Sequence, residues 1–349
     1  MSDDAFRLAC PAPNPSGAIQ LAHGGGGRAM HRLLDELLLR VVHSPSVAER
    51  HDSAVIEVGE QRVAFTTDGY VVNPLFFPGG DIGSLAVFGT VNDLAMAGAR
   101  PLALSLGLIL EEGLPIETVG RIAASVQRAC DAVGVRVVTG DTKVVDRGKG
   151  DGVYVTTSGI GLVPAGIRVS PARIAAGDAV LVNGDLGRHG VAILATREHL
   201  AFETTILSDC SPLVEPVKAL LDAGVDVHCM RDLTRGGLSS ALNELARAAN
   251  VTITLDELCV PVSSEVSAAC EILGLDPLYV ACEGRMAVFV PEAQAARAVE
   301  ILRTSGACPN AARVGSVEDR GGSHVVMRTC LGGRRVVDML SGEQLPRIC

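Results

Sequence analysis

The chain has 349 residues, and its 30 basic and 40 acidic side chains give a formal net charge of −10. At ~150 residues per domain, this length predicts about two domains. The acidic balance, without a long basic run, argues against nucleic acid or an anionic membrane as the main partner. No apolar segment reaches the ~18 residues that a membrane-spanning helix needs, and the N-terminus has no signal-peptide pattern. We therefore expect a cytoplasmic, two-domain globular protein.

The first half alternates between strand and helix patterns. Residues 1–20 are rich in proline and lack apolar periodicity, which predicts a loosely ordered arm. The Gly24–Gly27 run then opens onto an amphipathic pattern from Met30 to Val41, typical of a helix. We predict further helices over Ser84–Ala97 and Ile116–Val133, and strands over Ala54–Val58, Arg62–Thr67, Leu102–Leu110, Val135–Thr139 and Val153–Val163. This alternation indicates an α/β or α+β layered domain.

A second half begins near residues 164–177, where proline, glycine and arginine interrupt the pattern. It contains predicted strands at Ala179–Val182 and Val288–Val290, and predicted helices at Pro212–Ala223, Leu238–Ala249 and Glu292–Thr304. The last stretch, Gly332–Cys349, has one short apolar run and is predicted to be a tail.

Five aspartates stand beside small or polar residues rather than on charged faces. Asp52, Asp68 and Asp141 lie at predicted strand ends or turns, Asp93 lies in a predicted helix, and Asp232 belongs to the second half. Because Mg²⁺ takes carboxylate and phosphate oxygens, gathered aspartates would hold it against a nucleoside triphosphate. Taken singly, each aspartate is more simply a helix cap or turn residue.

Three further features have a functional and a plain interpretation. Gly24–Gly27 would present backbone N–H groups to phosphate or act as a hinge, and it matches neither the P-loop nor the dinucleotide fingerprint. Lys143, one of only three lysines in the chain, would neutralise a phosphate or lie on the surface. Glu283, just before an apolar strand, is a candidate general base or a turn carboxylate.

Cys349 is the last residue, on a stretch with little core pattern. Prenylation is excluded because it needs a cysteine fourth from the end. A mobile terminal thiol would act instead as a covalent carrier that enters an active site, since about 18 extended residues span up to ~60 Å. The alternative is a cysteine placed there by chance.

Ordered motifs along the chain resemble the HypE family of hydrogenase maturation factors. They are Asp52-Ser53-Ala54-Val55, Thr66-Thr67-Asp68-Gly69, Gly89-Thr90-Val91-Asn92-Asp93-Leu94, Gly140-Asp141-Thr142-Lys143, Met230-Arg231-Asp232-Leu233-Thr234-Arg235-Gly236-Gly237 and the closing Pro346-Arg347-Ile348-Cys349. The aspartate motifs are shared with the aminoimidazole ribonucleotide (AIR) synthetase and selenophosphate synthetase superfamily, whereas the terminal motif is specific. The resemblance covers nearly the whole chain after about residue 18.

The resemblance implies an α+β, two-domain PurM-like (AIR synthetase-like) fold with a flexible C-terminal tail. It implies an N-terminal arm over 1–20, an ATP-binding and dimerisation domain over 21–165, a second domain over 166–331 and the tail over 332–349. It also implies a homodimer built through the N-terminal sheets, with ATP and Mg²⁺ bound between the domains.

The resemblance further implies the reaction. The carbamoyltransferase HypF delivers a carbamoyl group to the Cys349 thiol, and ATP-dependent dehydration converts this thiocarbamate into a thiocyanate. The cyanide then passes to iron on the HypC–HypD complex for a [NiFe]-hydrogenase. Neither a nucleic acid nor a membrane is implied as a partner.

Roles carry over by motif position. Asp52, Asp68, Asp93 and Asp232 are implied as metal or nucleotide-phosphate residues. Supporting nucleotide contacts are implied for Asn92, Asp141 and Thr142. Cys349 carries the substrate, while Glu283 is the candidate for proton abstraction with Lys143 beside it.

Three other functions are compatible with parts of the sequence. A selenophosphate synthetase would need a reactive cysteine or selenocysteine and a lysine in the N-terminal arm; Cys10 is present, but no lysine precedes Lys143. An AIR synthetase gives no reason for the terminal cysteine. A non-catalytic nucleotide-binding scaffold predicts partner binding without ATP turnover that depends on Cys349.

Overall fold

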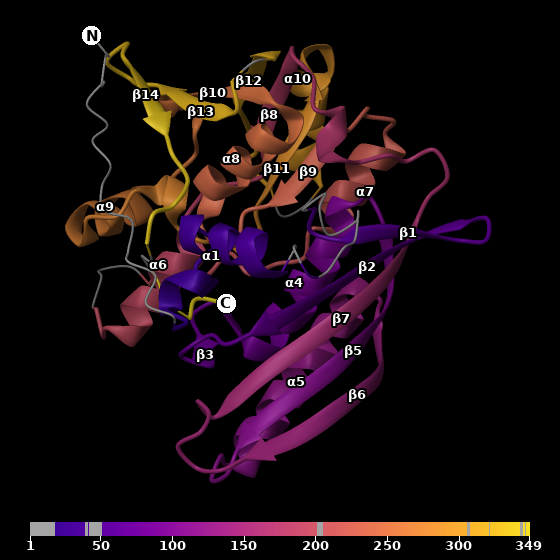
Figure 1. Ribbon diagram of the computed structural model, residues 1–349, viewed down its shortest axis with the longest axis vertical. Coiled ribbons are helices and arrows are strands. Elements are labelled where there is room, and N and C mark those ends of the chain that lie inside the picture. Colours follow the sequence, from indigo (N-terminus) through magenta and orange to yellow (C-terminus); the bar gives the residue numbers. More distant parts are fainter. Residues whose placement is uncertain are drawn as a thin grey trace.

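The computed structural model describes residues 18–38, 41, 51–200, 205–305, 308–320, 322–342, 345 and 347–349. Most of the predicted N-terminal arm, with Cys10, lies outside these residues, as does Pro346 of the terminal motif. Two sheets, one from each half of the chain, lie one beyond the other along the long axis of the molecule (Figure 1). The predicted α+β, two-domain architecture is confirmed.

The N-terminal sheet has five strands in the order β1-β2-β7-β5-β6. Their bounds are β1 Ala54–Val58, β2 Gln61–Tyr70, β5 Arg100–Glu111, β6 Arg136–Val145 and β7 Val153–Val163. Only β5 and β6 pair in parallel, and a parallel pair needs a long crossover, which helix α5 (Ile116–Val133) supplies. A small hairpin of β3 (Phe76–Phe77) and β4 (Gly80–Asp81) leads into helix α4 (Ile82–Met96).

Helices α4 and α5 cover one face of this sheet, and within the described residues no helix covers the other. Side chains of β7 alternate between buried and more exposed, as expected for a sheet covered on one side. Ala64 is buried with Leu94 of α4, whereas its neighbour Phe65 points the other way and is 43% exposed. Phe65 pairs across the strands with Ile160, which is 41% exposed. The uncovered face is therefore partly apolar.

The C-terminal sheet has seven strands in the order β14-β13-β10-β12-β8-β11-β9. Their bounds are β8 Asp178–Val182, β9 Cys229–Asp232, β10 Val251–Asp256, β11 Met286–Pro291, β12 Ala312–Arg320, β13 His324–Arg328 and β14 Arg334–Val337. The helices of this half are α6 Arg188–Arg197, α7 Val214–Asp222, α8 Gly237–Ala249, α9 Ser264–Leu273 and α10 Glu292–Thr304. Helix α8 packs on one face of the sheet, and α7 and α10 pack on the other. Both faces of β8 are consequently buried, which explains its unbroken apolar run.

Shorter elements connect these layers. The N-terminal segment forms a turn of 3₁₀ helix, then α1 (Arg28–Leu33), which continues as a wider helical turn over Leu34–Leu38. Further 3₁₀ turns are Pro171–Arg173, Glu257–Cys259 and Pro277–Tyr279. No helix among the described residues is long and apolar enough to cross a membrane.

Several predicted bounds match the structure, including those of β1, α5, β7 and α10. The strand predicted over Val135–Thr139 is too short, because β6 continues to Val145 and holds Gly140-Asp141-Thr142-Lys143 inside a strand rather than in a turn. Since β6 is an edge strand with exposed side chains, the apolar alternation that marks a strand is missing there. The predicted tail begins with β14, which pairs with β13; the domain limits themselves stay predictions.

Candidate active site

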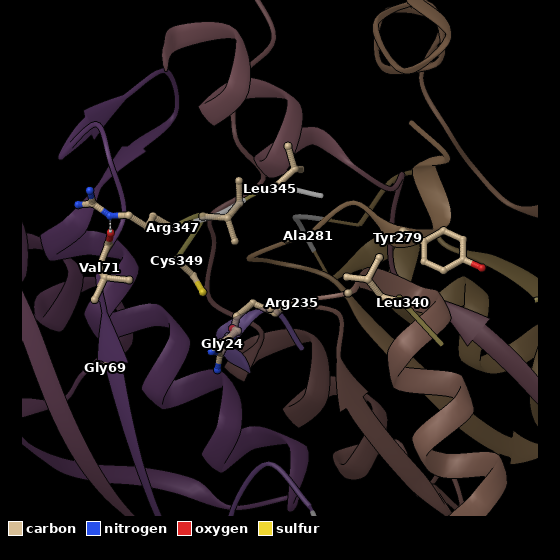
Figure 2. A pocket seen from close by; sticks show the side chains of 13 residues that line it. Gly24, Gly69, Val71, Arg235, Tyr279, Ala281, Leu340, Leu345, Arg347 and Cys349 are labelled. Atoms are coloured by element: carbon tan, nitrogen blue, oxygen red, sulfur yellow. Dashed lines mark hydrogen bonds between the residues drawn. The ribbon is translucent and has the colours of Figure 1, made fainter. Parts of the chain in front are cut away.

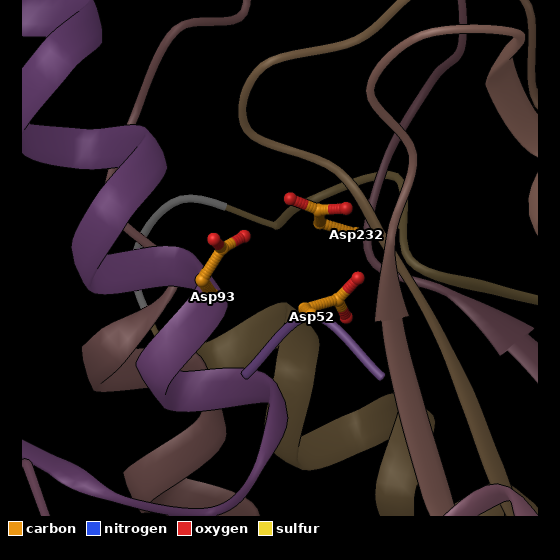
Figure 3. Close-up of side chains that lie close together, drawn as sticks. All are labelled: Asp52, Asp93 and Asp232. Atoms are coloured by element: carbon orange, nitrogen blue, oxygen red, sulfur yellow. The ribbon is translucent and has the colours of Figure 1, made fainter. Parts of the chain in front are cut away.

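Three carboxylates from distant parts of the chain meet between the two halves (Figure 3). Asp52 lies two residues before β1, Asp93 lies in α4, and Asp232 ends β9. One oxygen from each side chain lies within 4.8 Å of the others. We call Asp52, Asp93 and Asp232 the acid triad.

Burial makes it unfavourable for all three carboxyl groups of the acid triad to be ionised unless positive charge compensates them. Desolvation raises the pKa of Asp52 to about 6, opposed by the nearby Arg231 guanidinium. Desolvation and repulsion by neighbouring carboxylates raise the pKa of both Asp93 and Asp232 well above the usual range. The Asp52 Oδ2 atom is buried and has no hydrogen-bond partner among the described residues. A divalent cation with oxygen ligands fits this arrangement.

Neighbouring side chains hold the acid triad in place. The Thr66 hydroxyl donates to Asp93 Oδ2 at 2.7 Å. Arg231 Nε lies 2.7 Å from Asp52 Oδ1, and its Nη2 forms an ion pair with Glu244 of α8. Arg231 therefore fixes one oxygen of Asp52 and leaves the other directed away from the ion pair.

Asp68, predicted as a fourth metal or phosphate residue, lies near the end of β2 and is not a member of the triad among the described residues. Its Oδ1 accepts a hydrogen bond from Gly69 N at 2.8 Å. Its charge helps to raise the pKa of Asp93 and Glu283, so it belongs to the same electrostatic neighbourhood. Its role toward metal or nucleotide stays a prediction.

Glu283 lies in the loop before β11 and is 4% exposed. Its backbone N–H donates to Asp209 Oδ1 at 2.9 Å, while its side-chain Oε1 has no hydrogen-bond partner among the described residues. Desolvation, followed by the charges of Asp232 and Asp68, raises its pKa well above the usual range for glutamate. A buried carboxylate with a free oxygen and a raised pKa has the properties of a general base.

Asn92, predicted to contact the nucleotide, has its amide engaged with the protein. Its Nδ2 donates to Ser211 O at 3.1 Å and to Glu283 O at 3.4 Å, and its Oδ1 accepts from Leu213 N at 2.7 Å. These contacts join α4 to the loops that carry Glu283. The structure thus gives Asn92 a supporting position, and a nucleotide contact stays a prediction.

The C-terminal residue lies at the same junction. Cys349 lines a pocket with Arg235, Gly24 and Ile348, and its sulfur points into the pocket toward Arg235 (Figure 2). Burial raises the pKa of the Cys349 thiol to about 12, with Arg235 opposing the shift and Glu283 adding to it. The thiol, the Arg235 cation and the buried Glu283 carboxylate therefore act on one another.

The Gly24–Gly27 run closes one side of this pocket. Arg235 Nη1 donates to Gly24 O at 3.0 Å. A Cβ atom on Gly26, which has a positive φ, would lie 2.6 Å from Arg235 O, and one on Gly27 would lie 2.5 Å from Leu340 O. Only glycine permits this close backbone approach.

The β6 residues lie apart from the acid triad within one chain. Asp141 pairs through Gly107 and Thr156 with Gly69, so three strand spacings, ~14 Å, separate it from β2. Lys143 is exposed and forms an ion pair with Asp141. The structure does not bring Asp141, Thr142 or Lys143 beside Glu283 in a single chain, and their predicted roles stay untested.

Two residues that complete the site, Arg235 and Asp209, had no role predicted from the sequence. Arg235 stood within a quoted motif, but nothing local indicated that it would face Cys349. Asp209 lies in a loop without a motif and holds the backbone of Glu283. Only the folded path of the tail and of this loop reveals both contacts.

Comparison with known proteins identifies the family to which the two halves of the chain belong. The chain matches the family described as "AIR synthase related protein, N-terminal domain" over residues 50–163 and "AIR synthase related protein, C-terminal domain" over residues 175–328. These matches cover the N-terminal sheet and all strands of the C-terminal sheet except β14. The chain is thus an AIR synthase related protein with both characteristic domains.

The particular family follows from full-length relatives. A protein named carbamoyl dehydratase HypE from Azotobacter vinelandii is 50% identical over 334 residues, covering 96% of this chain and 98% of that protein. The crystal structure of hydrogenase maturation protein HypE in complex with ATP has a TM-score of 0.81 and 45% identity, and the match covers 95% and 100% of the two chains. The crystal structure of a HypE–HypF complex contains a chain with a TM-score of 0.84 and 39% identity, covering 88% and 99%. The chain belongs to the HypE family of carbamoyl dehydratases.

Proposed function

We propose that this chain dehydrates a carbamoyl group carried on its own Cys349 thiol, using ATP, and produces a protein thiocyanate. The observation that carries the proposal is the docked C-terminus, which places Cys349 beside Arg235 and within the influence of Glu283 and Asp232. The family's carbamoyl dehydratases and the ATP complex of a HypE structure support it.

The acid triad is proposed to hold Mg²⁺ with the phosphates of ATP. The buried, unpartnered Oδ2 of Asp52 and the mutual repulsion of three carboxylates fit a hard cation. When bound, Mg²⁺ would neutralise phosphate charge and so favour phosphoryl transfer. Asp68 is proposed to assist at the phosphates, with Asp141 and Thr142 as nucleotide contacts.

The proposed chemistry balances as thiocarbamate plus ATP giving thiocyanate, ADP and phosphate. The carbamoyl oxygen attacks the γ-phosphorus, the bond from that phosphorus to the bridging oxygen breaks, and ADP leaves. Loss of the two N–H protons and cleavage of the C–O bond then release phosphate and form the C≡N bond. Glu283 is proposed to accept a proton from nitrogen, because its free Oε1 is buried and its pKa is raised.

Arg235 is proposed to stabilise negative charge that develops on the activated group beside the sulfur. It is the cation that acts most directly on Cys349, and Gly24 O holds its guanidinium. A fixed cation of this kind costs no reorganisation at the moment of reaction.

Lys143 is proposed to act from a second copy of the chain. Its strand lies at the edge of the N-terminal sheet, whose uncovered face includes the exposed apolar side chains Phe65, Ile109 and Ile160. Burial of such a face against its own copy would make a homodimer through the N-terminal sheets. In that dimer, Lys143 and Asp141 belong to the interface region.

The proposed partners are HypF, as carbamoyl donor, and the HypC–HypD complex, as cyanide acceptor for a [NiFe]-hydrogenase. A HypE–HypF complex among the similar structures supports the first. We place the reaction in the cytoplasm, where the nine described cysteines would stay reduced.

The test is the mass of the C-terminal peptide after incubation with HypF, its carbamoyl donor and ATP. The expected result is a carbamoyl adduct on Cys349 that loses one water only while ATP is hydrolysed. Cys349→Ala should bind ATP but yield no adduct, and Cys330→Ala, at an exposed cysteine, should behave as wild type. An unmodified Cys349 with active HypF would favour a nucleotide-binding scaffold or another synthetase.

A further inference from the structure

His189 connects helix α6 to the docked tail. Its side chain is fully buried, and its Nε2 atom lies 2.7 Å from the carbonyl oxygen of Ile348, the residue before the terminal cysteine. Its Nδ1 atom lies 2.8 Å from Ser208 Oγ, and the edge of the Phe77 ring packs against the imidazole. Both ring nitrogens are therefore engaged.

These partners determine the tautomer. A carbonyl oxygen only accepts hydrogen bonds, so Nε2 carries the proton and donates to Ile348. Burial lowers the pKa of His189 and keeps the ring neutral, so Nδ1 accepts from the Ser208 hydroxyl. The same Ser208 oxygen accepts from Cys210 N at 3.0 Å. A continuous chain of hydrogen bonds thus fixes the imidazole before it meets the tail.

Other contacts also recognise the tail by its main chain. Val71 N donates to Cys349 O at 2.9 Å, and Asn73 N donates to Arg347 O at 3.3 Å. Arg197 Nη2 donates to Arg347 O at 2.9 Å. The His189 contact is the shortest of these four and comes from the most deeply buried donor side chain.

Main-chain recognition has a chemical consequence. The carbonyl groups of Arg347 and Ile348 and the terminal carboxylate of Cys349 are the same whether the sulfur carries hydrogen, a carbamoyl group or a cyano group. Release of the tail would leave the Nε2–H of His189 without its carbonyl partner in a buried position, which disfavours release.

We propose that His189 is a positioning residue that holds the docked state of the tail and aims the Cys349 sulfur at Arg235 and Glu283 in each of its chemical forms. The inference rests on the proposed function only for the identity of the group on the sulfur. His189 does not touch the reacting atoms and acts through the backbone of Ile348.

The test measures how fast iodoacetamide alkylates each cysteine, resolved by peptide mass, without ATP or a carbamoyl donor. His189→Phe retains bulk without the donor, whereas the amide nitrogen of His189→Gln takes the place of Nε2. Alkylation of Cys349 should be on the order of 10-fold faster in the Phe variant, because a buried hydrogen bond is lost, and near wild type in the Gln variant. Ser208→Ala should give a smaller increase of the same sign.

Internal references separate positioning from loosening of the fold. The exposed Cys259 and Cys330 should react equally in all variants, and the buried Cys229 and Cys282 should stay slow. An unchanged rate at Cys349 in the Phe variant overturns the proposal. So does a rise at Cys229 and Cys282 together with Cys349, since that result assigns His189 a general structural role.

A second measurement determines kcat and KM for ATP of the His189 variants in the full dehydration assay. Loss of positioning predicts a lower kcat with an unchanged KM for ATP, restored in part by His189→Gln. Because alkylation needs neither ATP nor a carbamoyl group, it reports on His189 even if Cys349 proves not to be the carrier. Selective alkylation in a protein that never dehydrates would support the positioning role and refute the proposed function.

Discussion

The acid triad and the docked tail place reactive groups at one site by opposite means. The triad uses side chains from a helix and two strand ends, and neighbouring ions and hydroxyls fix their oxygens. The tail, over residues 345 and 347–349, is held largely by hydrogen bonds to its main chain and by the burial of Ile348. The carboxylates proposed to bind Mg²⁺ are thus fixed by side-chain contacts at the junction of the two halves, whereas the thiol is held near them mainly by hydrogen bonds to the backbone of the tail.

The two regions differ in how readily their contacts can be broken and formed again. Removing a triad carboxylate changes a buried charge, which has large energetic consequences. Undocking the tail breaks a few hydrogen bonds, each with a modest net free energy. Substitutions in the two regions should therefore differ in size and in the step that they affect.

Glu283 acts electrostatically on both the acid triad and the tail, so we expect the largest effect from its substitution. Glu283→Gln keeps the shape and removes the base, and the dehydration rate should fall by about 10²- to 10⁴-fold. Carbamoylation of Cys349 should continue, so the carbamoylated peptide accumulates in mass spectra. Glu112→Gln, on the surface, is the matched control. Dehydration at the wild-type rate in Glu283→Gln would remove this residue from the chemistry.

Asp93→Asn tests the triad alone. ATP turnover should fall by about 10²- to 10³-fold, because an electrostatic partner of the phosphates is lost. Without Mg²⁺ at pH 7.5, the thermal midpoint should stay equal or rise, since burial and repulsion raise the pKa of Asp93 and its charge destabilises the fold. Asp131→Asn, on an exposed face of α5, should change neither quantity. A lower midpoint would contradict the repulsive triad.

The pH dependence of docking tests the tail alone. The pKa of Cys349 is raised to about 12 in the docked state from 9.0 for a free thiol. The raised value favours docking fully below pH ~9, and each unit above it should increase the released fraction about tenfold until pH ~12. Hydrogen exchange at Val71 N–H, which donates to Cys349 O, measures release, and Cys349→Ser should lack the effect. Equal pH profiles for the two proteins would contradict a raised pKa of the Cys349 thiol in the docked state.

The smallest effect is expected at Arg347. Its side chain pairs with Asp151 at 2.9 Å, and both groups are partly exposed, so the pair contributes ~0.2–1 kcal/mol. Arg347→Ala should speed alkylation of Cys349 about two- to fivefold, and Asp151→Asn should match it. The double variant should add little to either single change. A larger effect than that of His189→Phe would place the anchor of the tail at its charged side chain.

Much of the fold was accessible from the sequence, because α5, β7 and α10 carry regular apolar periodicity. The second half was harder to predict. The elements missed there are the helices α6 and α9 and the strands β9, β10, β12, β13 and β14, and the strands are defined by pairing between distant segments. Motif resemblance pointed to the aspartates of the triad, although nothing in the spacing of Asp52, Asp93 and Asp232 required them to meet.

The rest of the site depends on long-range geometry. Arg235 faces Cys349 because residues Val71 and Asn73 bind the tail backbone, and no local pattern encodes that pairing. His189 looks like any buried histidine until the Ile348 carbonyl is placed against it. Asp141 was expected at a strand end, and its position inside an edge strand depends on pairing with β5.

The amide of Asn92 has a mechanical consequence. It is 2% exposed and ties α4 of the N-terminal half to Ser211, Leu213 and Glu283 of the other half. A hinge motion between the halves would break these three hydrogen bonds and leave their buried donors and acceptors unpaired. The contacts of Asn92 therefore oppose a change in the angle between the two halves, whereas the last residues of the tail are held by the few hydrogen bonds described above.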